Sequence, residues 1–258
     1  MEISSQIVVV FNLRCGFLAI VFLFSTLFIN AQETNANTDT IPDGLHTEKQ
    51  GKMSVSGYYK NNLKTGNWTT FFETGQIHIV EYYNKGQKDG LYLKISKRGY
   101  IVEQAQYKND SLSGKKIVFA IGGKPKLIEN YKNGSLDGEK IIYYERGGIQ
   151  EESNYKNGLK DGVAKWYNTE KKLIAQYNYS NGIFDGNQYT YHANDTLRSV
   201  KLYKNDIKIG EFKEYFDNGK IKLQGSFKNG LKSGKWLEFN KDGELIKTTK
   251  FKKGIATN

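Results

Sequence analysis

The sequence predicts an all-β fold in which short β-hairpins repeat in tandem and build a single extended, twisted antiparallel sheet. Three observations predict it: a glycine at a fixed interval, an aromatic residue at a fixed distance from that glycine, and recurring Asn-Gly dipeptides. A unit this short cannot enclose a core alone, so neighbouring units must bury each other's apolar side chains. The junction glycines, 24 residues apart, are Gly66, Gly90, Gly114, Gly138, Gly162, Gly186, Gly210 and Gly234.

The first element in chain order is an apolar run from Phe17 to Ile29, which follows Arg14 and precedes Ala31. This pattern resembles a secretory signal peptide with cleavage after Ala31. As a helix the run would span about 20 Å, less than the roughly 30 Å of a bilayer core, so a retained membrane anchor is the weaker alternative. Residues 1–31 are therefore the predicted signal peptide, and we expect export to the periplasm, the outer envelope or the medium.

A flexible leader is predicted next, over residues 32–43, because Thr, Asn and Asp dominate there. The only cysteine, Cys15, lies in the segment expected to be removed, so the processed chain would hold no disulfide and no thiol nucleophile.

The repeat domain is predicted over residues 44–258. Gly44, Gly51, Tyr59 and Gly66 carry the marks of one imperfect unit, which we interpret as an N-terminal capping hairpin, and about eight units follow it. Apolar residues recur five, eleven and seventeen positions after each junction glycine, and we expect these columns to form the core. The strictest column is the last: Tyr83, Tyr107, Tyr131, Tyr155, Tyr179, Tyr203, Phe227 and Phe251.

Each unit should form one hairpin. Asn-Gly at 133–134, 157–158, 181–182 and 229–230 supplies the positive φ angles of a tight hairpin turn, and a second glycine near the middle of most units marks the other turn. A helix is excluded because no segment keeps an i, i+3, i+4, i+7 apolar pattern for three turns without meeting a glycine.

Charge marks one candidate binding surface. The chain has a formal net charge of +11, and one lysine column belongs to the repeat, directly after the aromatic of the strictest column in six units. Such a ladder along one margin of the sheet would suit an anionic polymer or membrane surface, whereas the alternative is a solvated row that blunts sheet pairing. Asp89, Asp137, Asp161 and Asp185 lie nearby and would partly neutralise it. The lysines are Lys108, Lys132, Lys156, Lys204, Lys228 and Lys252.

A second candidate surface is aromatic. Two positions after the junction glycine, the units at the two ends of the array carry Trp68, Tyr92, Phe212 and Trp236, whereas the middle units do not. These side chains would either form exposed patches suited to sugar stacking or protein contact, or supply extra packing for the end units. The sequence favours packing.

Catalysis finds no support in the sequence. His46, His78 and His192 fall in three different phases of the repeat and never at metal-ligand spacing, and no nucleophile elbow or nucleotide-binding loop is present. We therefore predict no catalytic residue, no metal and no cofactor. Nucleic acid is disfavoured as a partner because the aromatic residues occupy the columns expected to be buried and because export is expected.

The unit resembles the MORN-repeat variant family. The resemblance rests on Gly66-x-Trp68-x-x-Phe71, then Gly75-x-Ile77, and on Tyr155-Lys156-Asn157-Gly158 ending at Gly162, and it covers roughly residues 44–258. It implies an elongated β-hairpin array that binds another molecule. Bacterial members are often labelled antitoxin components of toxin-antitoxin systems, and eukaryotic arrays are associated with membrane phospholipids and scaffolding.

Three functional hypotheses follow, the weakest of which is a purely structural or surface-layer material. The first is a non-catalytic, exported, protein-binding scaffold of the cell envelope, with an antitoxin-like or immunity-like role as one form of it. The alternative is a surface module that binds anionic lipid or cell-wall glycan.

Overall fold

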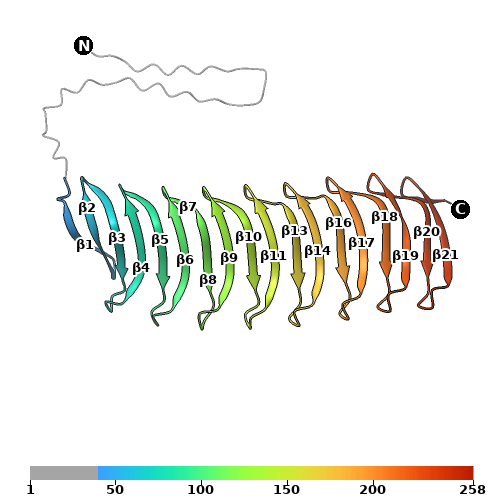
Figure 1. Ribbon diagram of the computed structural model, residues 1–258, viewed down its shortest axis with the longest axis horizontal. Helices are drawn as coiled ribbons and strands as arrows, with labels where there is room; N and C mark the ends of the chain where they lie inside the picture. The colour runs from blue at the N-terminus through green and yellow to red at the C-terminus, as the bar shows by residue number, and fades with distance from the viewer. Residues whose placement is uncertain (1–39, 258) are drawn as a thin grey trace, which may run out of the picture. The chain divides into compact units, whose positions relative to one another are not determined.

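The computed structural model describes residues 40–257, which form one open antiparallel sheet of 22 strands and no helix (Figure 1). The expected signal peptide and residues 32–39 of the expected leader lie outside the described residues. A helix able to cross a membrane is absent from the part of the chain that is described. The strands are β1 (Gly44–Gln50), β2 (Met53–Lys60), β3 (Leu63–Phe71), β4 (Ile77–Asn84), β5 (Gln87–Ile95), β6 (Ile101–Lys108), β7 (Ser111–Leu112), β8 (Gly114–Phe119), β9 (Pro125–Lys132), β10 (Ser135–Tyr143), β11 (Ile149–Lys156), β12 (Leu159–Lys160), β13 (Gly162–Tyr167), β14 (Leu173–Ser180), β15 (Ile183–Phe184), β16 (Gly186–Tyr191), β17 (Leu197–Lys204), β18 (Ile207–Tyr215), β19 (Ile221–Lys228), β20 (Leu231–Phe239), β21 (Leu245–Lys252) and β22 (Ile255–Thr257).

The strands follow one another in the sheet in chain order, so the sheet is a meander. β1 pairs with β2, β2 with β3, and the series continues to β21 and β22. At three places one strand position is shared by two short pieces; β7 and β8, for example, both pair with β6. Figure 1 shows the resulting hairpins stacked side by side with their strands bowed in the same sense. The predicted all-β hairpin array is confirmed.

The junction glycines mark an irregularity in the sheet. All eight have positive φ angles, from 64° at Gly210 to 156° at Gly90, a region that L-residues with a Cβ rarely adopt. Between β17 and β18, Leu202 pairs with Ile209 but Lys201 pairs with Phe212, so two residues including Gly210 are skipped. Bulges of this kind bend a strand and increase its twist. The 24-residue glycine period is therefore the period of a bulge.

The Asn-Gly turns form as the sequence predicts. Asn157 and Gly158 have φ angles of 49° and 83°, and both central residues of such a turn must be positive for the type I′ geometry that suits a two-residue hairpin. Where the dipeptide is absent, Asn205 and Asp206 adopt the same conformation with φ angles of 50° and 62°.

Each of these turns is also bonded to the turn before it. The N–H of Gly158 donates to the carbonyl of Leu136 at 2.7 Å, and the N–H of Gly182 donates to the backbone carbonyl of Lys160 at 2.7 Å. The same bond recurs at every one of eight successive turns, at 2.7–3.0 Å. Aspartates add a second link, since the N–H of Asn181 donates to the carboxylate of Asp161 at 3.0 Å. One margin of the sheet is therefore a continuous hydrogen-bonded row.

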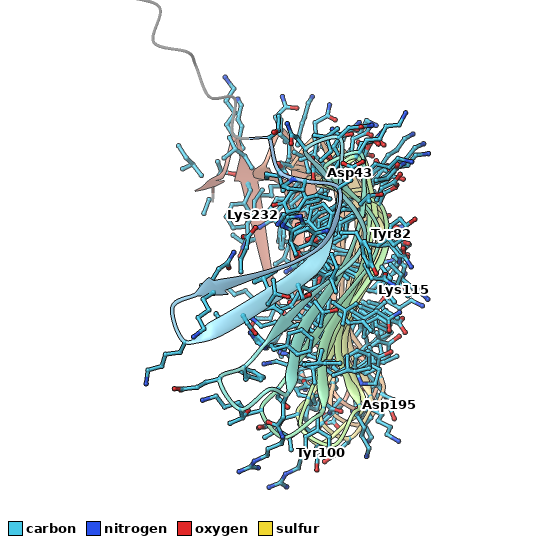
Figure 2. All side chains as sticks on the ribbon, turned by 90° about the vertical axis from the view of Figure 1, so that its left-hand side faces the viewer. Asp43, Tyr82, Tyr100, Lys115, Asp195 and Lys232 are labelled. Atoms are coloured by element: carbon cyan, nitrogen blue, oxygen red, sulfur yellow. The ribbon has the colours of Figure 1, made fainter. Side chains whose placement is uncertain are left out.

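The buried side chains lie on one face, which we call the inner face. Trp68, Phe212 and Trp236 are 1%, 8% and 3% exposed, and they point to the same side of the sheet as Lys232. Figure 2 shows Lys232 on one side of the sheet and Tyr82 and Lys115 on the other, which we call the outer face.

Packing on the inner face depends on matched sizes across strands. Gly225 pairs with Phe212 and also lies directly under the indole of Trp236, and Gly57 lies under Trp68 in the same way. The rings of Phe212 and Trp236 stack at 5.5 Å between centroids. In the middle of the array, ion pairs replace the aromatic contacts at the equivalent inner-face positions, such as Lys140 with Glu129 at 3.0 Å.

The expected core was therefore only partly right. The aromatic column seventeen after the junction glycine is half-buried on the inner face, but Ile77, Ile101 and Leu245 of the column at eleven are exposed. The reason is that the array is a single layer, so only the middle of the inner face is crowded enough to exclude water.

We predict that Gly225→Ala destabilises the array by about 1–3 kcal/mol, because an added Cβ would overlap the Trp236 ring and the strand must shift. Ser153→Ala is the matched control. Ser153 occupies the equivalent position, its buried hydroxyl has no hydrogen-bond partner among the described residues, and its loss should leave stability unchanged or improve it. Urea unfolding followed by tryptophan fluorescence measures both, and equal midpoints would contradict the packing argument.

We also predict loss of stability at alkaline pH. Burial raises the pKa of Tyr92 to about 12, and burial together with a hydrogen bond to Glu129 raises the pKa of Tyr131 to about 12. The unfolded chain releases these protons near pH 10, so between about pH 10 and 12 it binds fewer protons than the folded chain and the free energy of unfolding falls as pH rises. Denaturant titrations across this window measure the slope, which should be shallower in Tyr131→Phe. A slope that is flat in the parent chain would refute the prediction.

Candidate binding margin

The six lysines of the predicted column stand at the strand ends beside the two-residue turns, and all are exposed. Lys204 forms an ion pair with Asp185 at 2.9 Å. Among the described residues, no carboxylate lies within 4.0 Å of the other five. Four of those five, Lys108, Lys132, Lys156 and Lys228, project from β6, β9, β11 and β19, and Lys252 projects from β21.

The nearby aspartates neutralise this column less than expected. Asp137 and Asp161 accept hydrogen bonds from the backbone N–H groups of Asn157 and Asn181, and Asp89 accepts one from the side-chain amide of Asn84. Only Asp185 reaches a lysine of the column. The margin therefore keeps most of its positive charge.

An aliphatic residue stands opposite most of these lysines. The residue three positions before the junction glycine is the cross-strand partner of the lysine, as in Lys156 with Leu159 and Lys228 with Leu231. Directly paired residues share a face of the sheet, so lysine and aliphatic side chain stand together on the outer face beside the turn.

Five successive pairs form what we call the lysine–aliphatic ladder. It is continuous in the C-terminal half of the array, and its rungs are about 10 Å apart because each unit contributes two strands. Earlier in the chain Lys60 with Leu63 is an isolated pair of the same kind, and the three pairs after it are polar, such as Lys108 with Ser111 and Asn84 with Gln87. The rungs are Lys156–Leu159, Ser180–Ile183, Lys204–Ile207, Lys228–Leu231 and Lys252–Ile255.

The aliphatic side chains of the ladder are 37–71% exposed. Each leans on the glycine of the following turn where one is present; a Cβ placed on Gly182 would lie 3.4 Å from Leu159, and one on Gly254 would lie 3.3 Å from Leu231. One side of each aliphatic group is thus covered by the next unit, and the other side faces solvent. A row of half-exposed aliphatic groups beside free ammonium groups is suited to a partner that is both acidic and apolar.

The aromatic candidates do not join this surface. Trp68, Phe212 and Trp236 are buried, so the interpretation of the column as exposed patches is wrong for them, and Tyr92 is half-buried on the inner face. The cause is the packing over Gly57 and Gly225 described above. Packing of the end units, the alternative that the sequence favoured, is what these residues provide.

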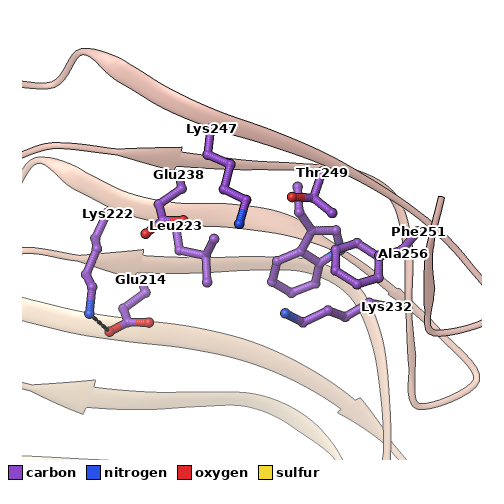
Figure 3. Close-up of a pocket in the computed structure, with 10 residues that line it drawn as sticks. Glu214, Lys222, Leu223, Lys232, Glu238, Lys247, Thr249, Phe251 and Ala256 are labelled. Carbon is purple, nitrogen blue, oxygen red and sulfur yellow. Dashed lines mark hydrogen bonds and ion pairs between the residues drawn. The ribbon is translucent and has the colours of Figure 1, made fainter. Parts of the chain in front are cut away.

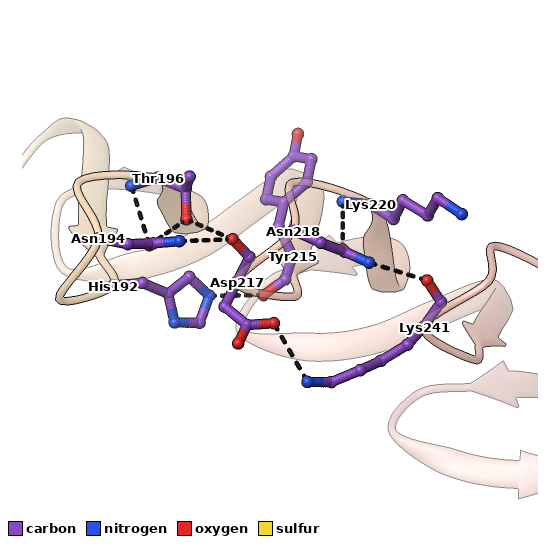
Figure 4. A network of polar contacts seen from close by, with 8 residues as sticks. All are labelled: His192, Asn194, Thr196, Tyr215, Asp217, Asn218, Lys220 and Lys241. Carbon is purple, nitrogen blue, oxygen red and sulfur yellow. Dashed lines mark hydrogen bonds and ion pairs between the residues drawn. The ribbon is translucent and has the colours of Figure 1, made fainter.

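The opposite margin of the sheet is closed by side chains that bond to the next unit. His192 donates to the carbonyl of Tyr215 at 2.9 Å, and Asn194 donates to that of Asp217 at 2.7 Å (Figure 4). Asn218 repeats the contact one unit later with the carbonyl of Lys241 at 2.9 Å. These polar groups are engaged in holding units together. No cluster of three or more metal-ligating side chains occurs in residues 40–257.

Two of the grooves formed by the described residues lie apart from the ladder. One, of about 500 Å³, lies on the inner face at the C-terminal end beside Trp236 and Phe251 (Figure 3). Its charged groups include both signs, and Lys222 and Glu214 already pair there at 3.0 Å. The other groove, of about 440 Å³, lies beside Tyr100 and is more apolar.

The array, its turns and its single-layer sheet define a β-hairpin repeat protein. A family model described as the MORN repeat variant matches residues 64–85, 136–157, 160–181, 184–205 and 208–229. The chain is therefore a MORN-repeat protein, and repeats of this type are commonly protein- or lipid-binding modules. A search among curated proteins found no match.

The matched windows include most lysines of the ladder but leave out its aliphatic residues. Lys156 and Lys204 fall inside them, whereas Leu159, Ile183 and Ile207 fall in the gaps between one window and the next. This aliphatic column was not among the sequence-based predictions. Its signal, an aliphatic residue three positions before the junction glycine, is visible once the units are aligned, but it is interrupted by Gln87, Ser111 and Ser135.

Proposed function

We propose that this chain is a non-catalytic scaffold that binds an acidic protein partner along the lysine–aliphatic ladder. The observation that supports it best is the continuous run of five rungs, each with a half-exposed to exposed Leu or Ile side chain, of which three also carry a lysine without a carboxylate within 4.0 Å among the described residues, namely Lys156, Lys228 and Lys252. Lysine attracts an acidic surface and sets its orientation, while the aliphatic groups supply the apolar contact that a stable interface needs.

The length of the ladder suits an extended partner. Five rungs at about 10 Å span about 40 Å along the sheet, which is comparable to a partner helix of roughly 27 residues at 1.5 Å each. An amphipathic helix or an acidic sheet margin would present its own charges and apolar groups at matching intervals. A compact small molecule would contact one or two rungs only.

We further propose that the protein works outside the cytoplasm, as a scaffold of the cell envelope. The support is the apolar run from Phe17 to Ile29, whose pattern resembles a secretory signal peptide. Neutralisation of a toxin, an immunity-like role, is one form that such binding would take, and it is implied by the family resemblance alone.

The lysines of the ladder provide the direct test. In Lys156→Glu/Lys228→Glu/Lys252→Glu, we expect loss of at least about 90% of the protein that the tagged parent chain captures from envelope extract, because three like charges now face an acidic partner. The matched control is Lys115→Glu/Lys126→Glu/Lys235→Glu, three exposed lysines outside the ladder that also lack a carboxylate within 4.0 Å among the described residues. Equal loss in both variants would reduce the effect to net charge and sink the proposal.

The second candidate function is binding to anionic lipid or cell-wall glycan. The net charge of +11 and the row of unpaired lysines favour it. Exposed lysines alone would bind such a surface weakly and in a salt-dependent manner, because separated charges are screened over about 10 Å at 0.1 M ionic strength.

The aliphatic rungs separate the two candidates. We expect Leu159→Ser/Ile207→Ser/Leu231→Ser to weaken capture of a protein partner about tenfold or more, since each removes an apolar contact. In the same variant, sedimentation with vesicles of anionic lipid or with peptidoglycan at low salt should stay as weak as in the parent chain. Strong sedimentation of the parent chain that the lysine variant abolishes would instead establish the second function.

A further inference from the structure

Strand β1 leaves one edge of the sheet open. It pairs along its whole length with β2, from Gly44 opposite Tyr59 to Gln50 opposite Met53. Within residues 40–257, no strand lies on its other side. The residues from Thr47 to Gln50 are all exposed. An open edge of this length is a template for pairing with another strand.

The opposite end of the sheet is protected by contrast. Strand β22 covers part of β21, and the rest of β21 carries Lys247 beside the exposed Leu245 and Ile246. Lys250 and Lys252 lie in the covered part. Lysines on an edge strand discourage pairing. β1 has a single lysine, Lys49, and it stands next to Glu48.

The hairpin geometry shows which groups β1 offers. A two-residue turn, Gly51 and Lys52, joins β1 to β2, and the pair that closes such a turn, Gln50 with Met53, is hydrogen-bonded. Hydrogen-bonding direction alternates along an antiparallel strand, so His46 and Glu48 bond to β2. The backbone groups of Leu45, Thr47 and Lys49 therefore point outward from the sheet.

We propose that β1 of one copy pairs antiparallel with β1 of a second copy about a two-fold axis at Thr47. In this register Thr47 faces Thr47, and Leu45 faces Lys49 twice. These are the residues whose N–H and C=O groups point outward, so each of these pairs can form two hydrogen bonds across the interface. The sheet would then continue from one copy into the other as a closed, isologous dimer.

The side chains favour the same register. His46 and Glu48 lie on the inner face, and the axis at Thr47 places His46 of each copy opposite Glu48 of the other. On the outer face, the aliphatic stem of Lys49 lies beside Leu45. Moving the axis to Glu48 would oppose two carboxylates, and moving it to Lys49 would oppose two ammonium groups, which is destabilising for directly paired residues.

The second copy meets no obstacle from the described residues next to β1. Ile41 and Asp43 bond back to the turn of their own copy, since the N–H of Ile41 donates to Asn62 at 2.7 Å and Asp43 accepts from the N–H of Asn61 at 2.7 Å. That turn lies beyond β2, on the side away from the open edge. The ladder lies in the other half of the array and stays free in the dimer, so the proposal is independent of the proposed partner.

Charge exchange tests the pairing. Sedimentation velocity of the purified chain should show a dimer at high micromolar concentration, as small interfaces require. We expect His46→Glu and Glu48→Lys each to raise the dimer dissociation constant about tenfold or more, because the first opposes two carboxylates and the second places an ammonium group against the imidazole. An equimolar mixture of the two variants should restore the dimer. One native pair of His46 with Glu48 is then kept, and the two substituted side chains, a glutamate and a lysine, face each other in the same heterodimer.

Two further variants keep the test decisive if a charge change disturbs folding. Thr47→Pro removes an outward N–H at the centre of the interface and should give a monomer with an unchanged far-UV circular dichroism spectrum. Lys247→Glu, at the opposite edge, should leave the dimer unchanged. A parent chain that stays monomeric at the highest concentration, a dimer that survives Thr47→Pro, or a mixture that fails to restore association would overturn the proposal.

Discussion

The structure depends on the bonds that join each unit to the next, because residues 40–257 form a single sheet and place no second layer over either of its faces. A sheet that packs against another layer gains most of its stability from buried apolar area. Here only a narrow row of side chains on the inner face is buried, and the repeated hydrogen bonds between successive units, such as Gly158 to Leu136, join the units along one margin as well. This explains why both residues of each turn keep positive φ even where the Asn-Gly dipeptide is absent, as at Asn205 and Asp206.

The buried row of side chains on the inner face is filled by different residue types in different units. At both ends of the array, an indole lies over a glycine, Trp68 over Gly57 and Trp236 over Gly225. In the middle, where Lys140 takes the tryptophan position, it pairs with Glu129 of the neighbouring strand. The bulge at each junction glycine sets where these side chains meet. What fills the space then varies from unit to unit, provided that sizes or charges match across the strands.

The sequence revealed the period, the hairpins and the tight turns because each depends on local backbone chemistry that glycine and asparagine report directly. It did not reveal which columns are buried. Alternation along a strand predicts the same burial for Trp68 and Tyr83. Only the bulge at Gly66, which shifts the strand pairing, shows that the indole of Trp68 lies over Gly57. Only the lysines of the candidate site could be predicted from the sequence, because they recur in six of eight units. Their aliphatic partners, Leu159 among them, form a run only in the C-terminal half.

Residues that hold this array together and residues free to recognise a partner occupy different places in the unit. The glycines, the turn asparagines and the inner-face aromatic side chains are required by the backbone geometry and packing, so a substitution at Gly225 would lower the stability of the array. Lys228 and Leu231 flank a turn whose backbone already has its hydrogen bonds, so their side chains can change without disturbing the strand pairing. Because β1 lies at the N-terminal end of a one-dimensional stack and the ladder in its C-terminal half, self-association through β1 would leave the ladder open, and a dimer would present two ladders to a partner at once.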